Sequence, residues 1–406
     1  MNNSRRKFLK NSGVVTGGIA LSANTPLASA LGSRVNGQEK DIVICVFQRG
    51  GADGLNSVVP HAEGEYFNLR PQTAVNDSID LDGFFGLNPD LAALKPIWDA
   101  GDLGIVHAVG STSDSRSHFD AQDSMEYANF DKNVLRTGWL ANYLSNTTTV
   151  EDSVFRAISL NDAIQKSIRG EVEALTISNI NDFDIFTHES LYEDTKQGVE
   201  EMFQNNTHFI DTTSVLFSAI DSLKQLNPDD FPVDNGANYQ DNDFADKLKT
   251  LGVIIKAGLG AEIICLDIGG WDHHNNIVDS FAAPAQSLSD GLLAFYQDMG
   301  ERMQNITILC MTEFGRRVAE NASLGTDHGH AGVMYAIGKQ VNGGEVFSNW
   351  PGLQENDLNR GDLEVTTDFR EVFSELLFKR LKYSDSLSSI IPNYSYGGGI
   401  GLFKSE

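Results

Sequence analysis

Residues 41–47 read Asp-Ile-Val-Ile-Cys-Val-Phe, a nearly continuous apolar run that lies between Lys40 and Gln48. A short run of this kind, rich in β-branched residues, predicts a strand buried on both faces, as in a parallel sheet. Similar runs recur along the chain at residues 103–109, 154–160, 174–178, 262–267, 305–311 and 333–338. We expect all of these strands to belong to one central sheet.

Longer stretches with helical spacing of apolar residues alternate with these strands, at residues 89–100, 118–128, 191–204, 244–258, 285–303 and 369–382. Asn88 can cap the first, with Pro89 at its first position, and Thr367 or Asp368 can cap the last. The alternation predicts an α/β fold with a mainly parallel central sheet and helices on both faces. Residues 170–242 are more polar, and we expect them to form a helical insertion or cap within a single domain spanning residues 31–406.

Residues 1–30 have the parts of an export signal. A twin-arginine motif with Arg5-Arg6 is followed by a weakly apolar stretch at residues 13–23 and by the small residues Ala28-Ser29-Ala30. We therefore expect the twin-arginine machinery to export the folded protein to a periplasmic or extracellular location. The apolar stretch is too short and glycine-rich to span a bilayer, and no cysteine lies near the cleavage site, so no stable membrane anchor is expected.

The chain has 406 residues, with 30 Lys+Arg against 56 Asp+Glu and a formal net charge of −26. Removing residues 1–30 deletes four basic residues and no acidic one, which takes −26 to −30. Such an acidic protein is not expected to bind nucleic acid or an anionic membrane surface. The three cysteines, Cys45, Cys265 and Cys310, fall inside predicted strands, which indicates buried free thiols rather than disulfides.

Five of the nine histidines gather in three short segments close to predicted strand ends. Asp272-His273-His274 follows a strand and a Gly-Gly turn, and Asp and His are good ligands for Zn²⁺, Mn²⁺ or iron. Asp267, which ends that strand, is a candidate ligand, a group that orients a ligand, or a loop cap. Because parallel strands end at the same edge of a sheet, we expect these side chains to share a site.

The second segment contains Asp327, His328 and His330, just ahead of the strand at 333–338. His328 and His330 are two residues apart, so an extended backbone directs both rings to one side. The third segment runs from Ser111 to His118 and opens a helix, where backbone N–H groups and Arg116 suit an anion. Simple helix capping is the alternative interpretation of its serines.

Two further segments bring carboxylates to strand ends. Asp53 lies in the loop after the first strand, and Glu313 follows the strand that ends at Met311. The second of these segments also carries Arg316. Either segment taken alone is an ordinary turn, and only their position beside the histidines suggests a site.

Five ordered motifs resemble the signatures of the domain of unknown function 1501 family: Arg49-Gly50-Gly51-Ala52-Asp53-Gly54, Ser115-Arg116-Ser117-His118-Phe119-Asp120-Ala121-Gln122, Gly269-Gly270-Trp271-Asp272-x-His274, Thr312-Glu313-Phe314-Gly315-Arg316 and Asp327-His328-Gly329-His330. That family is grouped with the alkaline phosphatase and sulfatase superfamily, and its members are typically exported by the twin-arginine route. The resemblance implies an alkaline-phosphatase-like fold with a metal-assisted site. It implies metal ligation by His330 before a late strand, by Asp272 and His274 after a middle strand, and by Asp53 after the first strand.

Two departures from the superfamily pattern leave alternatives open. Glu313-Phe314 stands where an Asp-His pair is usual, so a one-metal site is as open as a two-metal site. The nucleophile has no unambiguous counterpart: Ser115 fits best, and Ser117 and Thr112 are alternatives.

The leading hypothesis is a metal-dependent hydrolase or transferase, using a divalent metal such as Zn or Mn, that acts on phosphate, sulfate or related esters. In this hypothesis Asp53, Asp272, His274, Glu313, Asp327 and His330 hold the metal, and Ser115, Arg116, His118 and His328 carry the catalysis. Either His118 or His328 shuttles protons, and Arg116, with Arg316 as a further candidate, stabilises the anionic transition state. The alternative is a secreted binding or surface-assembly protein without turnover. An acyl-transfer serine hydrolase is disfavoured, because no G-x-S-x-G elbow occurs.

Overall fold

The computed structural model describes residues 34–35, 38–113, 115–131, 136–147, 153–180, 183, 191–203 and 207–405. The predicted export signal at residues 1–30 lies outside them. The strands are β1 (Arg34–Val35), β2 (Gln38–Glu39), β3 (Ile42–Gln48), β4 (Val58–Val59), β5 (Ile79–Asp80), β6 (Gly86–Leu87), β7 (Leu103–Gly110), β8 (Ala157–Ser159), β9 (Leu175–Thr176), β10 (Ile263–Ile268), β11 (Ile306–Met311), β12 (Gly332–Ile337), β13 (Glu345–Phe347) and β14 (Thr367–Asp368).

The α-helices are α3 (Gly54–Ser57), α4 (Gly64–Leu69), α5 (Lys95–Asp99), α6 (His118–Glu126), α7 (Trp139–Asn146), α8 (Tyr192–Phe203), α9 (Thr207–Lys224), α10 (Asp243–Lys256), α11 (Ile277–Ser280), α12 (Ala282–Met299) and α13 (Phe369–Lys379). Short 3₁₀ helices are η1 (Pro89–Leu94), η2 (Lys166–Ile168), η5 (Pro228–Asp230), η6 (Gly300–Gln304), η7 (Glu355–Asp357) and η8 (Leu387–Ser389). In the described part of the chain, no helix is both long enough and apolar enough to cross a membrane.

The main sheet has nine strands among the described residues, in the order β13-β7-β12-β11-β3-β10-β8-β9 with β14 also paired to β7. All seven predicted strands belong to it, and its pairs are parallel except for those that β12 makes with β11 and β7. The mainly parallel sheet is therefore confirmed. The direction of β12 has a consequence for the site, because its first residues lie at the edge where the neighbouring strands end.

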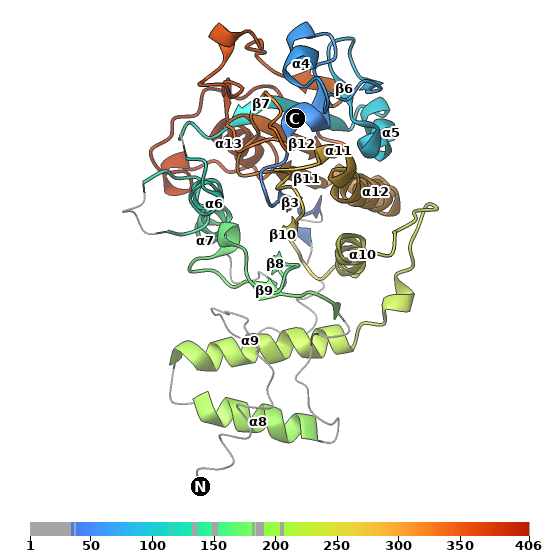
Figure 1. Cartoon of the computed structure of the whole chain (residues 1–406). Coiled ribbons are helices and arrows are strands. Elements are labelled where there is room, and N and C mark those ends of the chain that lie inside the picture. The colour runs from blue at the N-terminus through green and yellow to red at the C-terminus, as the bar shows by residue number, and fades with distance from the viewer. Residues whose placement is uncertain are drawn as a thin grey trace.

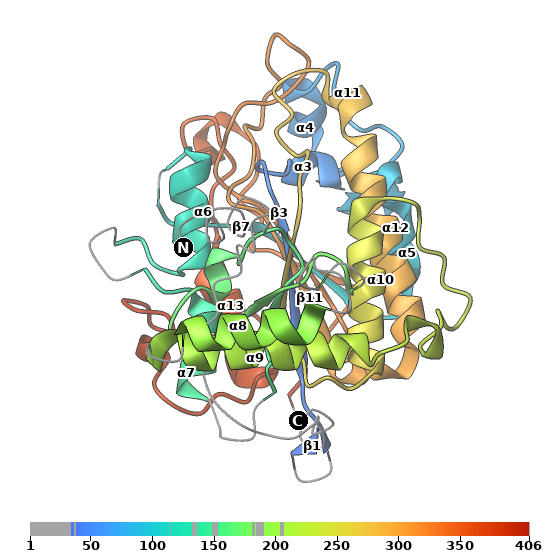
Figure 2. The same cartoon turned by 90° about the horizontal axis from the view of Figure 1, so that it is seen from below.

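Each face of the sheet is covered by its own set of helices (Figures 1 and 2). Ile44 and Val46 of β3 point to a core that contains Leu292 of α12, and this face also carries α5 and α10. Residues of β3 at alternate positions, such as Cys45, point to the opposite core with residues of α6, α7 and α13. The period of two along β3 thus divides the interior into two layers, as expected for a strand buried on both sides.

The cysteines lie as predicted, since Cys45, Cys265 and Cys310 are all buried and free. The predicted helix at 89–100 is instead the 3₁₀ helix η1 followed by α5, since Pro96 has no N–H to donate to an α-helical hydrogen bond across that junction. Its predicted cap is confirmed: Asn88 accepts a hydrogen bond from the N–H of Asp90. At the last helix the side chain that accepts the cap hydrogen bond is Asp368, from the N–H of Arg370.

The predicted insertion contains the helices α8 and α9, of which α9 was not predicted. The two helices pack on each other through an apolar cluster of Tyr192, Phe217 and Ile220. Figure 1 shows them beyond the β8–β9 edge of the sheet.

Candidate metal centre

The polar residues predicted from the sequence meet at the carboxyl edge of the sheet. The loops after β3, β10 and β11 and the segment before β12 lie beside the first residue of α6, which follows β7. The approach of these loops is close: a Cβ on Gly50, whose φ is +125°, would lie 2.7 Å from the backbone nitrogen of Asp272. Glycine is therefore required at position 50, both for its φ and for the space that the neighbouring loop occupies.

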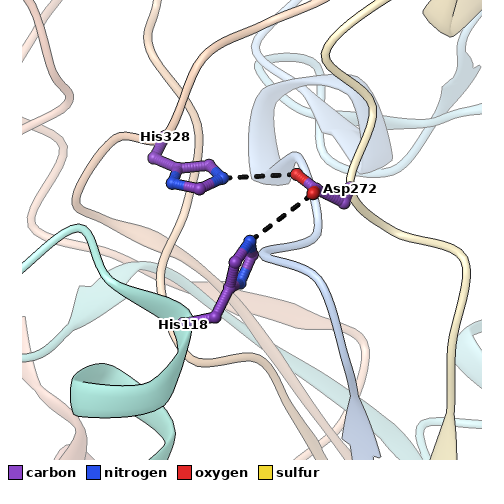
Figure 3. A group of neighbouring side chains, drawn as sticks. All are labelled: His118, Asp272 and His328. Atoms are coloured by element: carbon purple, nitrogen blue, oxygen red, sulfur yellow. Dashed lines mark hydrogen bonds and ion pairs between the residues drawn. The ribbon is translucent and has the colours of Figure 1, made fainter.

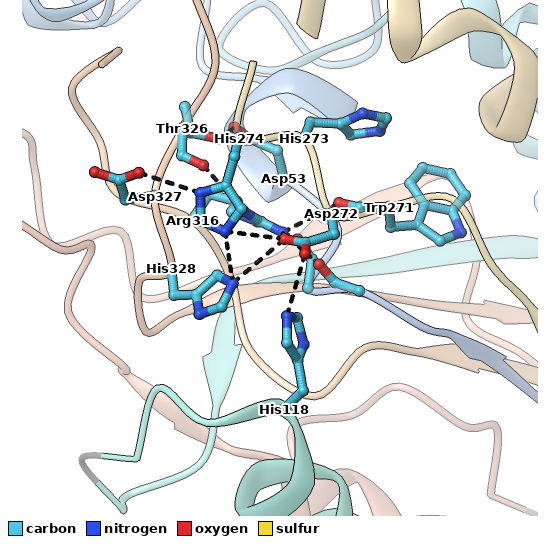
Figure 4. Close-up of polar contacts among 12 residues, drawn as sticks. Asp53, His118, Trp271, Asp272, His273, His274, Arg316, Thr326, Asp327 and His328 are labelled. Atoms are coloured by element: carbon cyan, nitrogen blue, oxygen red, sulfur yellow. Dashed lines mark hydrogen bonds and ion pairs between the residues drawn. The ribbon is translucent and has the colours of Figure 1, made fainter. Parts of the chain in front are cut away.

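Three imidazoles converge on the carboxylate of Asp272 (Figure 4), and Figure 3 shows two of them, those of His118 and His328. The Nε2 atom of His118 lies 3.5 Å from Asp272 Oδ2. The Nε2 atoms of His274 and His328 lie 3.2 Å and 3.3 Å from Asp272 Oδ1. The two rings are also close to each other, with 3.0 Å between the Nε2 atoms of His274 and His328.

The opposite nitrogen of each ring is held by an acceptor. The Nδ1 contacts are His118 to Glu313 Oε1 at 2.8 Å, His274 to Asp327 Oδ1 at 3.2 Å, and His328 to the carbonyl oxygen of Arg116 at 2.9 Å. An imidazole that donates from Nδ1 to a carboxylate or carbonyl keeps a lone pair on Nε2. Donation from Nδ1 would therefore leave the three Nε2 atoms, which all face Asp272, available to a metal ion.

Arg316 fixes the position of the Asp272 carboxylate. Partial burial raises the pKa of Asp272, but the hydrogen bond and the charge of Arg316 outweigh burial and bring the pKa to about 2. The buried guanidinium also donates to backbone carbonyls of three site loops, those of Gly51, Thr326 and Trp271. Because these contacts use its donors, Arg316 ties the loops together and is not placed to receive a substrate anion, contrary to its candidate role in the sequence analysis.

Glu313 is buried behind His118 and does not face the convergence point. Its carboxylate accepts from Gly50 N, Gln122 Nε2 and Thr312 Oγ1 in addition to the contact with His118 Nδ1. Burial raises the pKa of Glu313, but the hydrogen bond from His118 and those from its other donors lower it below the ordinary value overall. The same hydrogen bond raises the pKa of His118, against burial. The sequence analysis expects Glu313 to be a ligand, whereas its geometry fits a residue that orients one.

The distances agree with a metal site. One ligand atom each from His118, Asp272 and His328 all lie within 4.8 Å of one another. Ligands about 2.1 Å from a tetrahedral metal ion are separated by roughly 3.4 Å, which is close to the 3.2–3.5 Å between the imidazole nitrogens and Asp272. Nitrogen and carboxylate donors without thiolate suit Zn²⁺, Mn²⁺ or iron. The described residues therefore include a His/Asp site that can hold a metal ion.

Asp53 and His330, both expected to be ligands, lie apart from this group of donors. Asp53 is buried, caps α3 at Asn56, pairs with Arg70 at 2.9 Å and accepts from Thr326 Oγ1 at 3.0 Å. Its two oxygens are therefore already engaged. His330 is buried, and its Nε2 has no hydrogen-bond partner among the described residues.

Ser115 and Arg116 flank the site in the segment before α6. The Ser115 hydroxyl accepts a hydrogen bond from the N–H of Ser117 at 3.3 Å, so this partner belongs to the same short segment. The Arg116 guanidinium pairs with the buried carboxylate of Asp362. Thus the side chain of Arg116 is partnered, while its carbonyl orients His328.

Gln122, Arg70 and Asp362 were not singled out from the sequence. Gln122 lies four residues after His118 on α6, and this helical spacing is a signal that could have placed it beside His118. Arg70 and Asp362 carry no such signal, because their partners are 17 and 246 residues away along the chain.

Comparisons with solved structures give distant matches to alkaline phosphatases. The enzyme from the Antarctic bacterium TAB5 has 8% identity and a TM-score of 0.32, covering 74% of this chain and 93% of its own. The alkaline phosphatase of Thermus thermophilus has 11% identity and a TM-score of 0.30, covering 68% of this chain and 60% of its own. The PH0037 protein of Pyrococcus horikoshii has 11% identity and a TM-score of 0.31, with 88% and 99% covered.

No curated protein matches the sequence. A family model described as "Protein of unknown function (DUF1501)" matches residues 105–377, which include His118, Asp272, His274, Glu313 and His328. This range covers most of the chain, from β7 to α13. The chain therefore belongs to the DUF1501 family.

Proposed function

We propose that the chain is an exported, metal-dependent hydrolase or transferase that acts on phosphate, sulfate or related esters. One observation carries the proposal: three imidazole Nε2 atoms with anchored Nδ1 atoms converge on the carboxylate of Asp272. Ring orientation of this kind is a recurring property of metal ligands, whose second nitrogen is held by a carboxylate or carbonyl. Zn²⁺ or Mn²⁺ is the expected occupant.

His118, His328 and Asp272 would hold the ion, and His274, whose Nε2 lies 3.0 Å from that of His328, is a further candidate ligand. A divalent metal in such a site supplies Lewis acidity toward an ester oxygen and lowers the pKa of a bound water. The residues around these ligands hold them in position. Glu313 and Asp327 hold the rings of His118 and His274, and Arg316 keeps Asp272 ionised.

The nucleophile is either a water molecule or Ser115. In favour of Ser115, its segment leads directly into α6 and His118. In favour of water, the Ser115 hydroxyl accepts from Ser117 N, and no contact between it and a site histidine occurs among the described residues. Substitution of Ser115 separates the two, because a water nucleophile leaves turnover largely unchanged in Ser115→Ala.

The second candidate function is a metal-binding protein without turnover. It is favoured by the number of nearby donors, because His274 would bring the three grouped donors, His118, His328 and Asp272, to the four that are typical of structural zinc sites. A catalytic site keeps one position open for water or substrate. In the catalytic proposal His274, the most exposed of the three rings, does not ligate the ion, and its position stays open for water or substrate.

The test is metal analysis of the purified protein, followed by assays with aryl phosphates and aryl sulfates. We expect about one metal ion per chain in the wild type and in His61→Ala, a histidine variant outside the site, and loss of that ion in His328→Ala. Turnover on either ester, lost with the metal, supports the catalytic proposal. Bound metal without turnover on any ester supports the second candidate. A wild-type protein that binds no metal under any loading condition contradicts both.

A further inference from the structure

The described part of the chain exposes six large apolar side chains, and they fall into two groups. Three belong to the insertion predicted at residues 170–242: Leu191, Met202 and Val233. The other three, which we call the apolar rim, are Phe119, Val278 and Leu324, with exposed fractions of 80%, 60% and 38%. Single apolar side chains scattered over a surface need no explanation, whereas a group of them beside a polar site is typical of ligand binding.

Phe119 lies beside a candidate metal ligand. It is the second residue of α6 and directly follows His118, so the Cα atoms of the two residues are about 3.8 Å apart. The Asp272 carboxylate that His118 faces is itself 48% exposed. An apolar ring stabilises the fold only where it is removed from water, so a phenyl group this exposed contributes little to folding. Its position fits a ring that a ligand covers at the entrance of the site.

Val278 and Leu324 lie together, on two segments joined by the backbone. The N–H of Ile277, the residue before Val278, donates to the carbonyl of Leu324 at 2.8 Å. Leu324 has a φ of +58°, a left-handed conformation that is uncommon for a residue with a bulky side chain. Glycine or asparagine would adopt this conformation with less strain, so the turn alone does not account for an exposed leucine here.

The turn that carries Leu324 is fixed to the site by Asn321. The side chain of Asn321 accepts from the N–H of Gly325 at 3.1 Å, within the turn. It donates to the carbonyl of His274 at 2.9 Å and to Asp327 Oδ1 at 3.1 Å. Leu324 is therefore held in place relative to His274, on the opposite end of the site residues from the α6 segment of Phe119.

The polar groups between these side chains decide what kind of ligand fits. The side chains of Asp272 and Asp327 are 48% and 57% exposed. A membrane or a broad protein surface that covered the whole apolar rim would also bury these carboxylates, which is unfavourable. A small molecule avoids this, because its charged end can lie at the metal centre while an apolar group covers the rim.

We propose that the apolar rim binds an apolar group on the alcohol part of the ester, so that the substrate is an ester of an apolar alcohol. Phe119 contacts this group from the α6 side, and Val278 and Leu324 contact it from the side of His274. The inference rests on the proposed function and deepens it, since the metal ligands do not select among alcohols.

The test is isothermal titration calorimetry of the metal-loaded protein with phenylphosphonate and methylphosphonate, and with the corresponding sulfonates. Each pair has one anionic head and differs in the apolar group, and ester hydrolysis does not break the bond from carbon to phosphorus or sulfur. We expect the phenyl compound to bind about tenfold more tightly than the methyl compound to the wild type. Phe119→Ser should reduce this ratio to about two and leave the affinity for the methyl compound unchanged.

Val278→Ser and Val233→Ser are a matched pair, because they make the same change at an exposed valine inside and outside the apolar rim. Val278→Ser should lower the ratio about twofold, and Val233→Ser should leave it at the wild-type value. Metal content and thermal unfolding are measured for each variant, so that a loss of the site or of the fold is not taken for a loss of the apolar contact.

A wild-type ratio near one overturns the inference, as does a wild-type ratio in Phe119→Ser or a metal-loaded wild type that binds none of the four compounds. Hydrolysis of a small polar ester such as glycerol phosphate as fast as an aryl phosphate also overturns it, while supporting the proposed function. A ratio that depends on Phe119, without turnover of any ester, contradicts the proposed function and leaves the apolar rim as a binding site.

Discussion

The neighbours His273 and His274 belong to two different regions of the molecule. His274 is exposed at the polar edge of the sheet and directs Nε2 to Asp272. His273 is buried beside Trp271 and Phe281, accepts or donates only through Nδ1 to Ser280 Oγ at 3.0 Å, and leaves Nε2 without a partner among the described residues. Residue type alone therefore does not make a ligand; the side of the loop on which a ring lies decides it.

Protonation also differs between the rings, and at the polar edge it differs from ring to ring. There the hydrogen bond to Glu313 raises the pKa of His118 above its ordinary value, whereas burial lowers the pKa of His328. In the interior, burial lowers the pKa of His273, and it lowers the pKa of the fully buried His107 to about 4. Carboxylates beside a ring stabilise its charged form, whereas apolar neighbours such as Phe85, stacked on His107, do not.

The largest effect is expected at the point where the polar region converges. Asp272→Ala removes the anionic donor and leaves the buried charge of Arg316 facing three imidazoles, so the affinity for Zn²⁺ or Mn²⁺ should fall by at least about 100-fold. Metal content after dialysis and competition with a chromophoric chelator measure this. Asp279→Ala, an exposed acid on α11, is the control. Unchanged affinity for the metal ion in Asp272→Ala would show that this carboxylate is not one of the ligands.

The interior region is tested by the pH dependence of the free energy of unfolding. The folded-state pKa of His107 is about 4 and the ordinary value is about 6.5, so the unfolded chain takes up this proton first as pH falls. The contribution of neutral His107 to stability is complete above about pH 6.5 and is lost progressively toward pH 4, by roughly 3 kcal/mol in the free energy of unfolding. Urea unfolding at pH 7 and pH 4.5 measures the loss, and His107→Gln should show a correspondingly shallower pH dependence. Equal slopes in the two proteins would contradict the expectation.

The smallest effects separate two residues within the polar region. Glu313 is buried and holds His118, whereas Asp327 is exposed and holds His274. We expect Glu313→Gln to weaken metal binding by about 10- to 100-fold, as is typical when the partner of a ligating histidine is changed. Asp327→Asn should weaken it only about threefold, because exposed ion pairs contribute less than about 1 kcal/mol. The same titration compares them, and an Asp327→Asn effect as large as that of Glu313→Gln would remove the distinction between them.

Much of the fold could be predicted from the sequence because its strands are apolar on both faces. The run at 41–47 corresponds to β3, and the run at 305–311 to β11, each within one residue at either end. The edge strands β13 and β14 have no such pattern and were missed, since they are short and partly exposed. Helix α9 was missed because Asn and Asp clusters on either side of it suggested loops.

Which residues gather at the site was predicted better than the role that each of them has there. Position after a strand end identified His118, Asp272, His274 and His328, which the structure brings together. The assignment of Glu313 depended on which way its carboxylate points, and this is set by donors distant in sequence, Gly50 in the loop after β3 and Gln122 on α6. Such long-range contacts leave no local signal in a single sequence.

The antiparallel strand β12 determines when the residues of the site can come together. Strand β7 ends at Gly110, whereas β12, its neighbour toward the centre of the sheet, begins 222 residues later in the sequence, at Gly332. Closing a pairing of such sequence separation is slow and comes after local structure. Since His118 follows β7 and His328 precedes β12, the two rings can both reach Asp272 only when the last quarter of the chain is available. In a growing chain the residues of the proposed metal centre therefore come together only when synthesis is almost finished.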